Sequence, residues 1–169
     1  MRTTAASHRS DESCSPLTVL MKFRMIVNSA KRHYRWIEQE CGVNGAHLWA
    51  LWEISRANGM RVSELGTALA MHQSTASNLI EKLVRSGLIT RSRSPEDRRV
   101  VTLALTKKGS ALLKRAPRPA RGILPEALHR LPHKTLVQLD RSLLALLEHM
   151  KAGDKSGKST PLALLLGKD

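Results

Sequence analysis

The hydrophobic pattern changes its period at Gly87, and this change limits the possible folds more than any other feature of the chain. Between residues 73 and 86, apolar side chains recur at steps of three and four residues, which predicts an amphipathic helix with one buried side. After Gly87, two segments rich in β-branched residues (89–93 and 100–105) flank a charged turn, which predicts a β-hairpin. The apolar positions of the helix are Ala76, Leu79, Ile80, Leu83 and Val84.

Helical spacing predicts three further helices before this unit. A long amphipathic helix is expected over 17–41, ending at Gly42, and a second helix over 45–56. A short helix is expected over 64–70, with Ser63 as its N-cap. The short helix and the one at 73–86 are close enough in sequence to form a helix-turn-helix pair.

The segment after the hairpin is also mainly helical, but prolines interrupt it. Thr106 is expected to cap a helix that begins at Lys107, and the last helix is expected over 132–151. Four prolines lie between residues 116 and 132. Because proline inside a helix removes a hydrogen bond and clashes with the preceding turn, this stretch must be kinked or broken.

A helix-turn-helix followed by a two-stranded hairpin is a winged helix-turn-helix, so the predicted fold class is mainly α with a β-wing. In this fold the second helix of the pair fits the major groove of DNA, and the hairpin meets the minor groove or the backbone. On the helix, the predicted DNA contacts are Gln73, Ser74, Thr75, Ser77, Asn78 and Lys82, and Arg85 also suits the DNA backbone. On the hairpin they are Arg91, Arg93, Asp97, Arg98 and Arg99, with Asp97 expected to orient Arg99.

The charge of the chain supports a polyanionic partner. The 169 residues carry a formal net charge of +14, which favours binding to nucleic acid or to an anionic membrane surface. The longest apolar run (162–166) is too short to cross a bilayer, and the polar start does not resemble a signal peptide. We therefore expect a cytoplasmic, nucleoid-associated protein whose partner is double-stranded DNA and not a membrane.

Residues 61–109 resemble the MarR family of bacterial transcriptional regulators. The resemblance depends on three motifs in order: LIEKLVRSGLITR, the Asp-x-Arg pair formed by Asp97 and Arg99, and LALTKKG. It implies a homodimer whose terminal helices interlock, with one winged module for each half of an inverted-repeat operator. It also implies repression that is relieved by a small molecule bound between the dimer helices and the DNA-binding lobe. The proline-rich segment 116–132 departs from the longer unbroken helix of the family.

This resemblance gives the expected domain organisation. Residues 1–15 are expected to form a flexible arm, 16–152 a MarR-type domain, and 153–169 a flexible tail. Within the domain, the DNA-binding lobe is expected at about 45–106 and the dimerisation helices at 17–41 and 107–152.

Four side chains are candidates for the effector pocket, because they lie where the family binds ligands. They are His33, His47, Trp49 and Trp52, and their aromatic character favours an aromatic or phenolic acid. The alternative for each of them is ordinary packing or surface polarity.

Other functions have less support in the sequence. The charge would also suit an architectural, nucleoid-type protein that binds DNA without sequence preference. The chain lacks a catalytic cluster, so an enzyme or a cofactor is not expected. His129 and His133 have the spacing of a metal-ligand pair, but Pro132 would break the helix that aligns them, so a metal is not expected either. Cys14 and Cys41 could sense oxidants, but their positions favour inert thiols.

Overall fold

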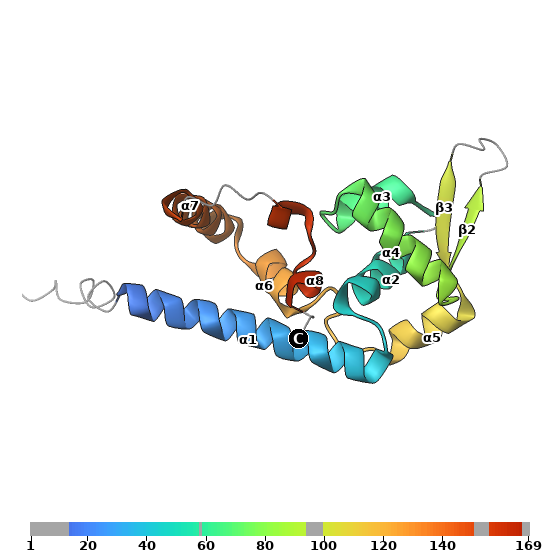
Figure 1. The fold of residues 1–169 in the computed structure, drawn as a ribbon, viewed down its shortest axis with the longest axis horizontal. Coiled ribbons are helices and arrows are strands. Elements are labelled where there is room, and N and C mark those ends of the chain that lie inside the picture. The colour runs from blue at the N-terminus through green and yellow to red at the C-terminus, as the bar shows by residue number, and fades with distance from the viewer. Residues whose placement is uncertain (1–13, 58, 94–99, 151–155, 167–169) are drawn as a thin grey trace, which may run out of the picture.

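We analysed a computed structural model of the protein, which describes residues 14–57, 59–93, 100–150 and 156–166. Most of the described chain is helical, with one small antiparallel sheet (Figure 1). The elements are α1 (Pro16–Cys41), α2 (Gly45–Arg56), β1 (Met60–Arg61), α3 (Val62–Ala68), α4 (Gln73–Arg85), β2 (Ile89–Arg93), β3 (Val101–Leu105), α5 (Lys107–Arg115), α6 (Ile123–Arg130), α7 (His133–His149), a 3₁₀ turn (Ser156–Ser159) and α8 (Leu162–Leu166).

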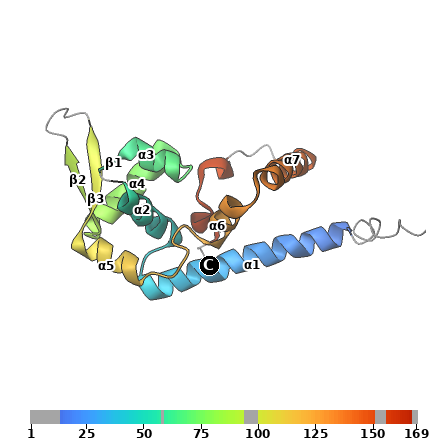
Figure 2. The ribbon, with the colours of Figure 1, turned by 180° about the vertical axis from the view of Figure 1, so that it is seen from behind.

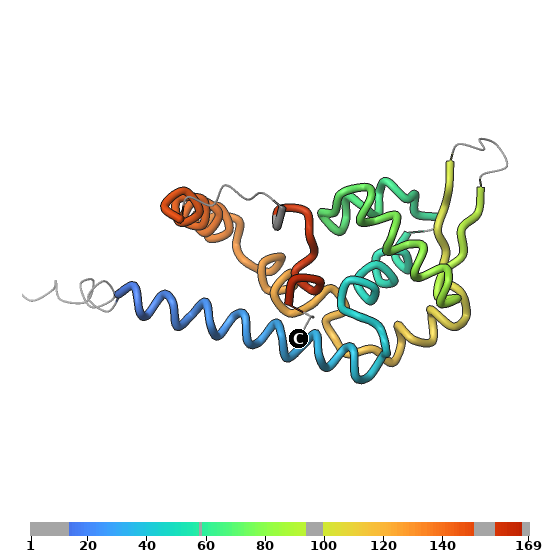
Figure 3. The backbone as a smooth tube through the Cα atoms, in the orientation of Figure 1, coloured from blue at the N-terminus to red at the C-terminus, as the bar shows by residue number. Residues whose placement is uncertain are grey.

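The elements fall into two regions along the long helix α1. One region, the winged lobe, consists of α2 to α5 and the sheet, and it lies at the C-terminal end of α1 (Figures 1 and 3). The other consists of α6, α7 and the N-terminal half of α1, and it lies at the opposite end of the molecule (Figure 2). α6 packs on α1, and α8 packs on both α1 and α2. The predicted winged helix-turn-helix is therefore confirmed.

Local signals place most of the helix ends where the sequence predicts them. α1 ends at Gly42, which has a left-handed φ of 65°. After α4, Gly87 has a φ of 68°, and the amide of Leu88 donates to the carbonyl of Leu83 at 3.0 Å. This is the Schellman arrangement that lets a glycine end a helix. Thr106 Oγ1 accepts a hydrogen bond from the amide of Gly109 at 3.0 Å and so caps α5.

The core of the winged lobe draws one or more leucines or isoleucines from each of its main elements. These side chains are completely buried and interlock, so they fix α4 relative to the sheet and to α2. They are Leu48 and Leu51 of α2, Leu65 of α3, Ile80 and Leu83 of α4, and Leu88, Ile89 and Leu103 in and around the sheet.

The sheet has one strand more than the sequence predicts. β2 and β3 form the expected hairpin, with Ile89 opposite Leu105 and Arg93 opposite Val101. The additional strand, β1, pairs with the other edge of β3 through Met60 and Leu103. Two residues are too few to show an alternating pattern, and this is why the sequence gives no signal for β1.

The start of α3 also differs from the prediction. α3 begins at Val62, so Ser63 lies inside the first turn and is not the N-cap. The stabilising contact comes from Glu64, whose Oε2 accepts the amide hydrogen of Arg61 at 2.8 Å.

The expected flexible tail does not hold for residues 156–166. Pro161 and Ala163 are buried, and α8 packs against both α1 and α2. Gly45 makes this fit possible, because a Cβ atom there would lie 3.2 Å from Ala163 Cβ and closer still to the ring of Tyr34. Burial of the apolar side chains of this segment against two helices stabilises the short helix.

The proline-rich stretch is broken, as predicted. α5 ends at Arg115, and residues 116–122 cross α1 before α6 begins at Ile123. His33 of α1 is buried under this crossing, with its Nε2 atom 3.1 Å from the carbonyl oxygen of Pro119.

Candidate nucleic-acid interface

The outward side of α4 is polar and is held rigidly from behind. Four of the predicted contacts, Gln73, Ser74, Asn78 and Lys82, are exposed, and Thr75 and Ser77 are half-buried. Behind them, the buried stripe of α4 packs into the core of the winged lobe. The structure therefore gathers all six predicted contacts on one element with a fixed backbone.

Two further α4 residues lie on this polar side. Glu81 and Arg85 are exposed and, at spacings of three and four residues, continue the face that Ser74 and Asn78 begin. Glu81 places a carboxylate among donors and cations. Helical spacing alone could have identified it as a member of this face.

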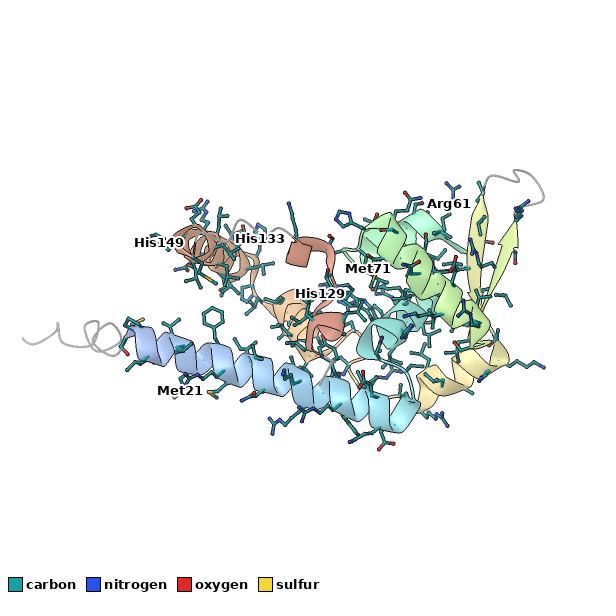
Figure 4. All side chains as sticks on the ribbon, viewed as in Figure 1. Met21, Arg61, Met71, His129, His133 and His149 are labelled. Carbon is teal, nitrogen blue, oxygen red and sulfur yellow. The ribbon has the colours of Figure 1, made fainter. Side chains whose placement is uncertain are left out.

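The hairpin presents two arginines beside α4. Arg91 and Arg93 are exposed on β2, opposite Leu103 and Val101 of β3. The hairpin projects from the winged lobe next to α3 and α4 (Figure 1). The other three predicted wing residues, Asp97, Arg98 and Arg99, lie outside the described residues. Arg61 on the edge strand β1 is a further exposed cation on this side of the molecule (Figure 4).

The four candidate pocket residues do not share one pocket. His33 is buried under residues 116–122, and His47 lies beside α4 in a hollow with Asn78 and Lys82. Trp49 points elsewhere and donates from Nε1 to Glu53 Oε1 at 2.8 Å. Burial lowers the pKa of both histidines, an effect opposed at His33 by the bond to Pro119 and increased at His47 by the charge of Lys82.

Trp52 has the most distinctive surroundings of the four. The guanidinium carbon of Arg121 lies 4.4 Å from its ring centroid, and that of Arg56 lies at 4.7 Å. Both distances are in the range of cation–π contacts. Arg121 Nε also lies 3.7 Å from Glu126 Oε2. This cluster joins α2 to the start of α6.

Other kinds of site find no support in the described part of the chain. His, Cys, Asp and Glu residues there do not gather in threes that could hold a metal ion. None of the described helices combines the length and the apolarity needed to cross a membrane. Cys14 is exposed, whereas Cys41 is buried, and burial raises the pKa of the Cys41 thiol, which makes it less reactive.

Comparisons with known proteins agree with this geometry. The MarR family model matches residues 44–101, which include α2 to α4 and β2 and end at the first residue of β3. This part of the chain is therefore similar to the DNA-binding domain of that family. Proteins of this family are DNA-binding transcriptional regulators, so the match is to DNA-binding proteins and not to enzymes.

Individual relatives extend the similarity beyond this domain. The transcriptional repressor MprA of Escherichia coli (strain K12) is 28% identical over 170 residues, covering 83% of this chain and 94% of MprA. A MepR-like protein complexed with pseudoligands has a similar fold, with a TM-score of 0.55, 21% identity, and coverage of 91% of this chain and 98% of its own.

A third similar structure was solved with DNA. A cysteine-to-serine mutant of MarR from Escherichia coli, complexed with operator DNA, has a TM-score of 0.50 and 20% identity. The similarity covers 78% of this chain and 97% of that one.

Proposed function

We propose that this protein is a ligand-responsive, homodimeric repressor that binds one inverted-repeat DNA sequence. The observation that supports this most directly is the rigid polar side of α4 beside a basic hairpin. The similar MarR structure in complex with operator DNA provides a precedent for the same fold. A protein acting in this way would work on the bacterial nucleoid, in the cytoplasm.

The proposal assigns base reading to the first half of α4. Gln73, Ser74, Ser77 and Asn78 carry short amide and hydroxyl groups near the helix start, where the helix enters the major groove. An amide can bond bidentately to adenine, and a hydroxyl can bond to several bases. Lys82 and Thr75 lie on one flank of the helix and suit the backbone.

The wing is assigned to the minor groove and the neighbouring backbone. Arg91 and Arg93, both exposed, are proposed to contact phosphates, which add affinity but carry no sequence information. Arg99 is proposed to enter the minor groove with Asp97 as its orienting partner, and Arg98 to contact the backbone. A narrow minor groove concentrates negative potential, and this favours arginine.

Dimerisation is proposed through the region at the N-terminal end of α1. α7, all of whose residues are described, contributes no buried residue. Large apolar side chains are exposed on α1 and α7: Leu17, Leu20, Met21, Met25, Ile26, Leu136, Leu143, Leu144, Leu146, Leu147 and Met150. A second copy would cover this surface and place two winged lobes about one DNA turn apart.

The proposed effector is a small aromatic or phenolic acid. Trp52 with Arg56 and Arg121 supports this class, since the cluster gathers an aromatic ring and two cations near the junction of the two regions. His33, His47 and Trp49 are less suited to the same ligand, because their side chains lie apart from this cluster.

Binding selection followed by mutation tests the sequence-specific function. The tightest-binding duplex is selected from a random library, and its affinity is compared with that for random DNA. Ser77→Ala and Asn78→Ala should each cost roughly 1–3 kcal/mol on the selected duplex and much less on random DNA. Equal losses on both would favour the alternative, an architectural DNA-binding protein without sequence preference.

A further inference from the structure

A small hollow lies between the beginning of α2 and one flank of α4. Its volume is about 210 Å³. Its polar rim consists of Asn44, His47, Thr75, Asn78 and Lys82, and Leu79 and Leu164 complete it on the apolar side. The sequence does not predict this arrangement, because His47 and Lys82 belong to different helices.

The chemistry of the rim suits an anion. Lys82 supplies an ammonium group, Thr75 supplies a hydroxyl, and His47 supplies an imidazole. None of the described residues that line the hollow is acidic. Asn44 already uses its Oδ1 atom to accept the amide hydrogen of His47 at 2.9 Å, which holds the start of α2 in place.

The position of the hollow suits a phosphate of the DNA backbone. An α-helix with its side chains is about 10–12 Å wide, and the major groove is about 12 Å wide. A helix that reads base edges therefore places its two flanks beside the two phosphate chains. Thr75 and Lys82, seven residues apart, lie on the flank of α4 that faces His47.

We propose that the hollow binds one backbone phosphate of DNA, held by Lys82 from α4 and His47 from α2. This inference rests on the DNA-binding function proposed above. It assigns His47 to DNA contact, in place of the effector pocket that the sequence suggests for it.

The site would make DNA binding depend on pH. In the free protein, burial and the charge of Lys82 lower the pKa of His47, so its imidazole is neutral at pH 7. Lys82 is the charged group against it, and the other residues around the hollow do not titrate. A phosphate placed between the two side chains favours the protonated imidazole. Binding is then coupled to proton uptake, and the affinity for DNA rises as the pH falls.

The test measures the affinity of the full-length protein for its selected duplex between about pH 8 and about pH 5.5. At constant salt, the wild-type affinity should rise by roughly threefold to tenfold over this range. His47→Gln should remove most of this rise. His129→Gln, a substitution at an exposed position on α6, serves as the matched control and should leave the rise intact (Figure 4).

The salt dependence and a modified backbone test the ligand. In the proposed homodimer Lys82→Ala removes one phosphate contact from each protomer, so it should reduce the slope of log affinity against log salt by about 1.8, twice the value of about 0.9 for one phosphate. Replacing single phosphates by neutral methylphosphonates should reveal one position at which His47→Gln has no further effect.

The outcomes separate this inference from the proposed function. A wild-type protein that binds no duplex above the random level overturns the proposed function. Specific binding with the same pH dependence in wild type and His47→Gln overturns only the phosphate site. If a free phosphate ion shifts the His47 ring resonances but no methylphosphonate position removes the effect of His47→Gln on the affinity for DNA, the occupant is not the DNA backbone.

Discussion

The two regions of the molecule differ in how well one chain can bury their apolar side chains. In the winged lobe, Leu51, Leu65 and Leu83 are completely buried within a single chain. On α7, by contrast, Leu147 is 51% exposed, and Met150, the C-cap of this helix, is 64% exposed. A chain that completes one core and leaves the other open has a folded DNA-reading module and a surface suited to a partner.

The largest expected effect concerns the region formed by α6, α7 and the N-terminal half of α1, where large apolar side chains are exposed. Leu143→Lys combined with Leu147→Lys should weaken self-association by about 3–6 kcal/mol, because each buried leucine is worth about 1.5–3 kcal/mol. Sedimentation velocity at micromolar concentration should show dimers for the wild type and monomers for the variant. An unchanged tryptophan fluorescence spectrum would confirm that the winged lobe is still folded. A variant that stays dimeric would exclude this face of α7 as the interface.

A substitution in the core of the winged lobe should lower the free energy of unfolding and leave self-association largely unchanged. Leu83→Ala should lower the free energy of unfolding by about 2–5 kcal/mol, since it leaves a cavity in the core of the winged lobe. The neighbouring Val84→Ala, at a position that is 36% exposed, is the matched control and should cost much less. Urea unfolding at several protein concentrations checks both. If Leu83→Ala acts mainly through dimer dissociation, the comparison of the two regions is wrong.

The sequence predicts the winged lobe better than it predicts the region of α6 and α7, for a physical reason. The stripe on α4, the turn at Gly87 and the cap at Thr106 are local signals, because a few consecutive residues determine each of them. The structure confirms all three. The breaks caused by the prolines are local as well.

The sequence does not predict features that depend on contacts between residues far apart in the chain. β1 forms where Met60 pairs with Leu103 at the edge of β3, and α8 packs where Ala163 lies beside Gly45. For the candidate site, the spacing on α4 identifies the polar side of that helix. It cannot show that His47 of α2 and Lys82 of α4 line the same hollow. It also cannot show that Trp52 lies against Arg121.

The smallest expected effect concerns His33, at the junction of the two regions. The side chain is 6% exposed, and its Nε2–H can donate to the carbonyl oxygen of Pro119 only while that nitrogen keeps its proton. Burial lowers the pKa of His33 below its ordinary value of 6.5, although the bond to Pro119 opposes this shift. The folded state therefore favours the neutral ring more strongly than the unfolded state does.

The sign of the pH effect follows from this difference. Above pH 6.5 the ring is neutral in both states, and the full stability is present. As the pH falls through 6.5 toward the lower folded-state pKa, the unfolded state binds the proton first and the stability decreases.

His33→Gln keeps a donor for Pro119 but cannot titrate, so its free energy of unfolding should vary less between about pH 7.5 and about pH 5.5 than that of the wild type. His133→Gln, on the exposed side of α7, should behave as the wild type does. Because His47 also has a lowered pKa, the His33→Gln variant should retain part of the slope, and only His33→Gln combined with His47→Gln should remove most of it. Urea unfolding at fixed salt measures all four proteins, and equal slopes in the wild type and His33→Gln would show that the junction does not respond to pH.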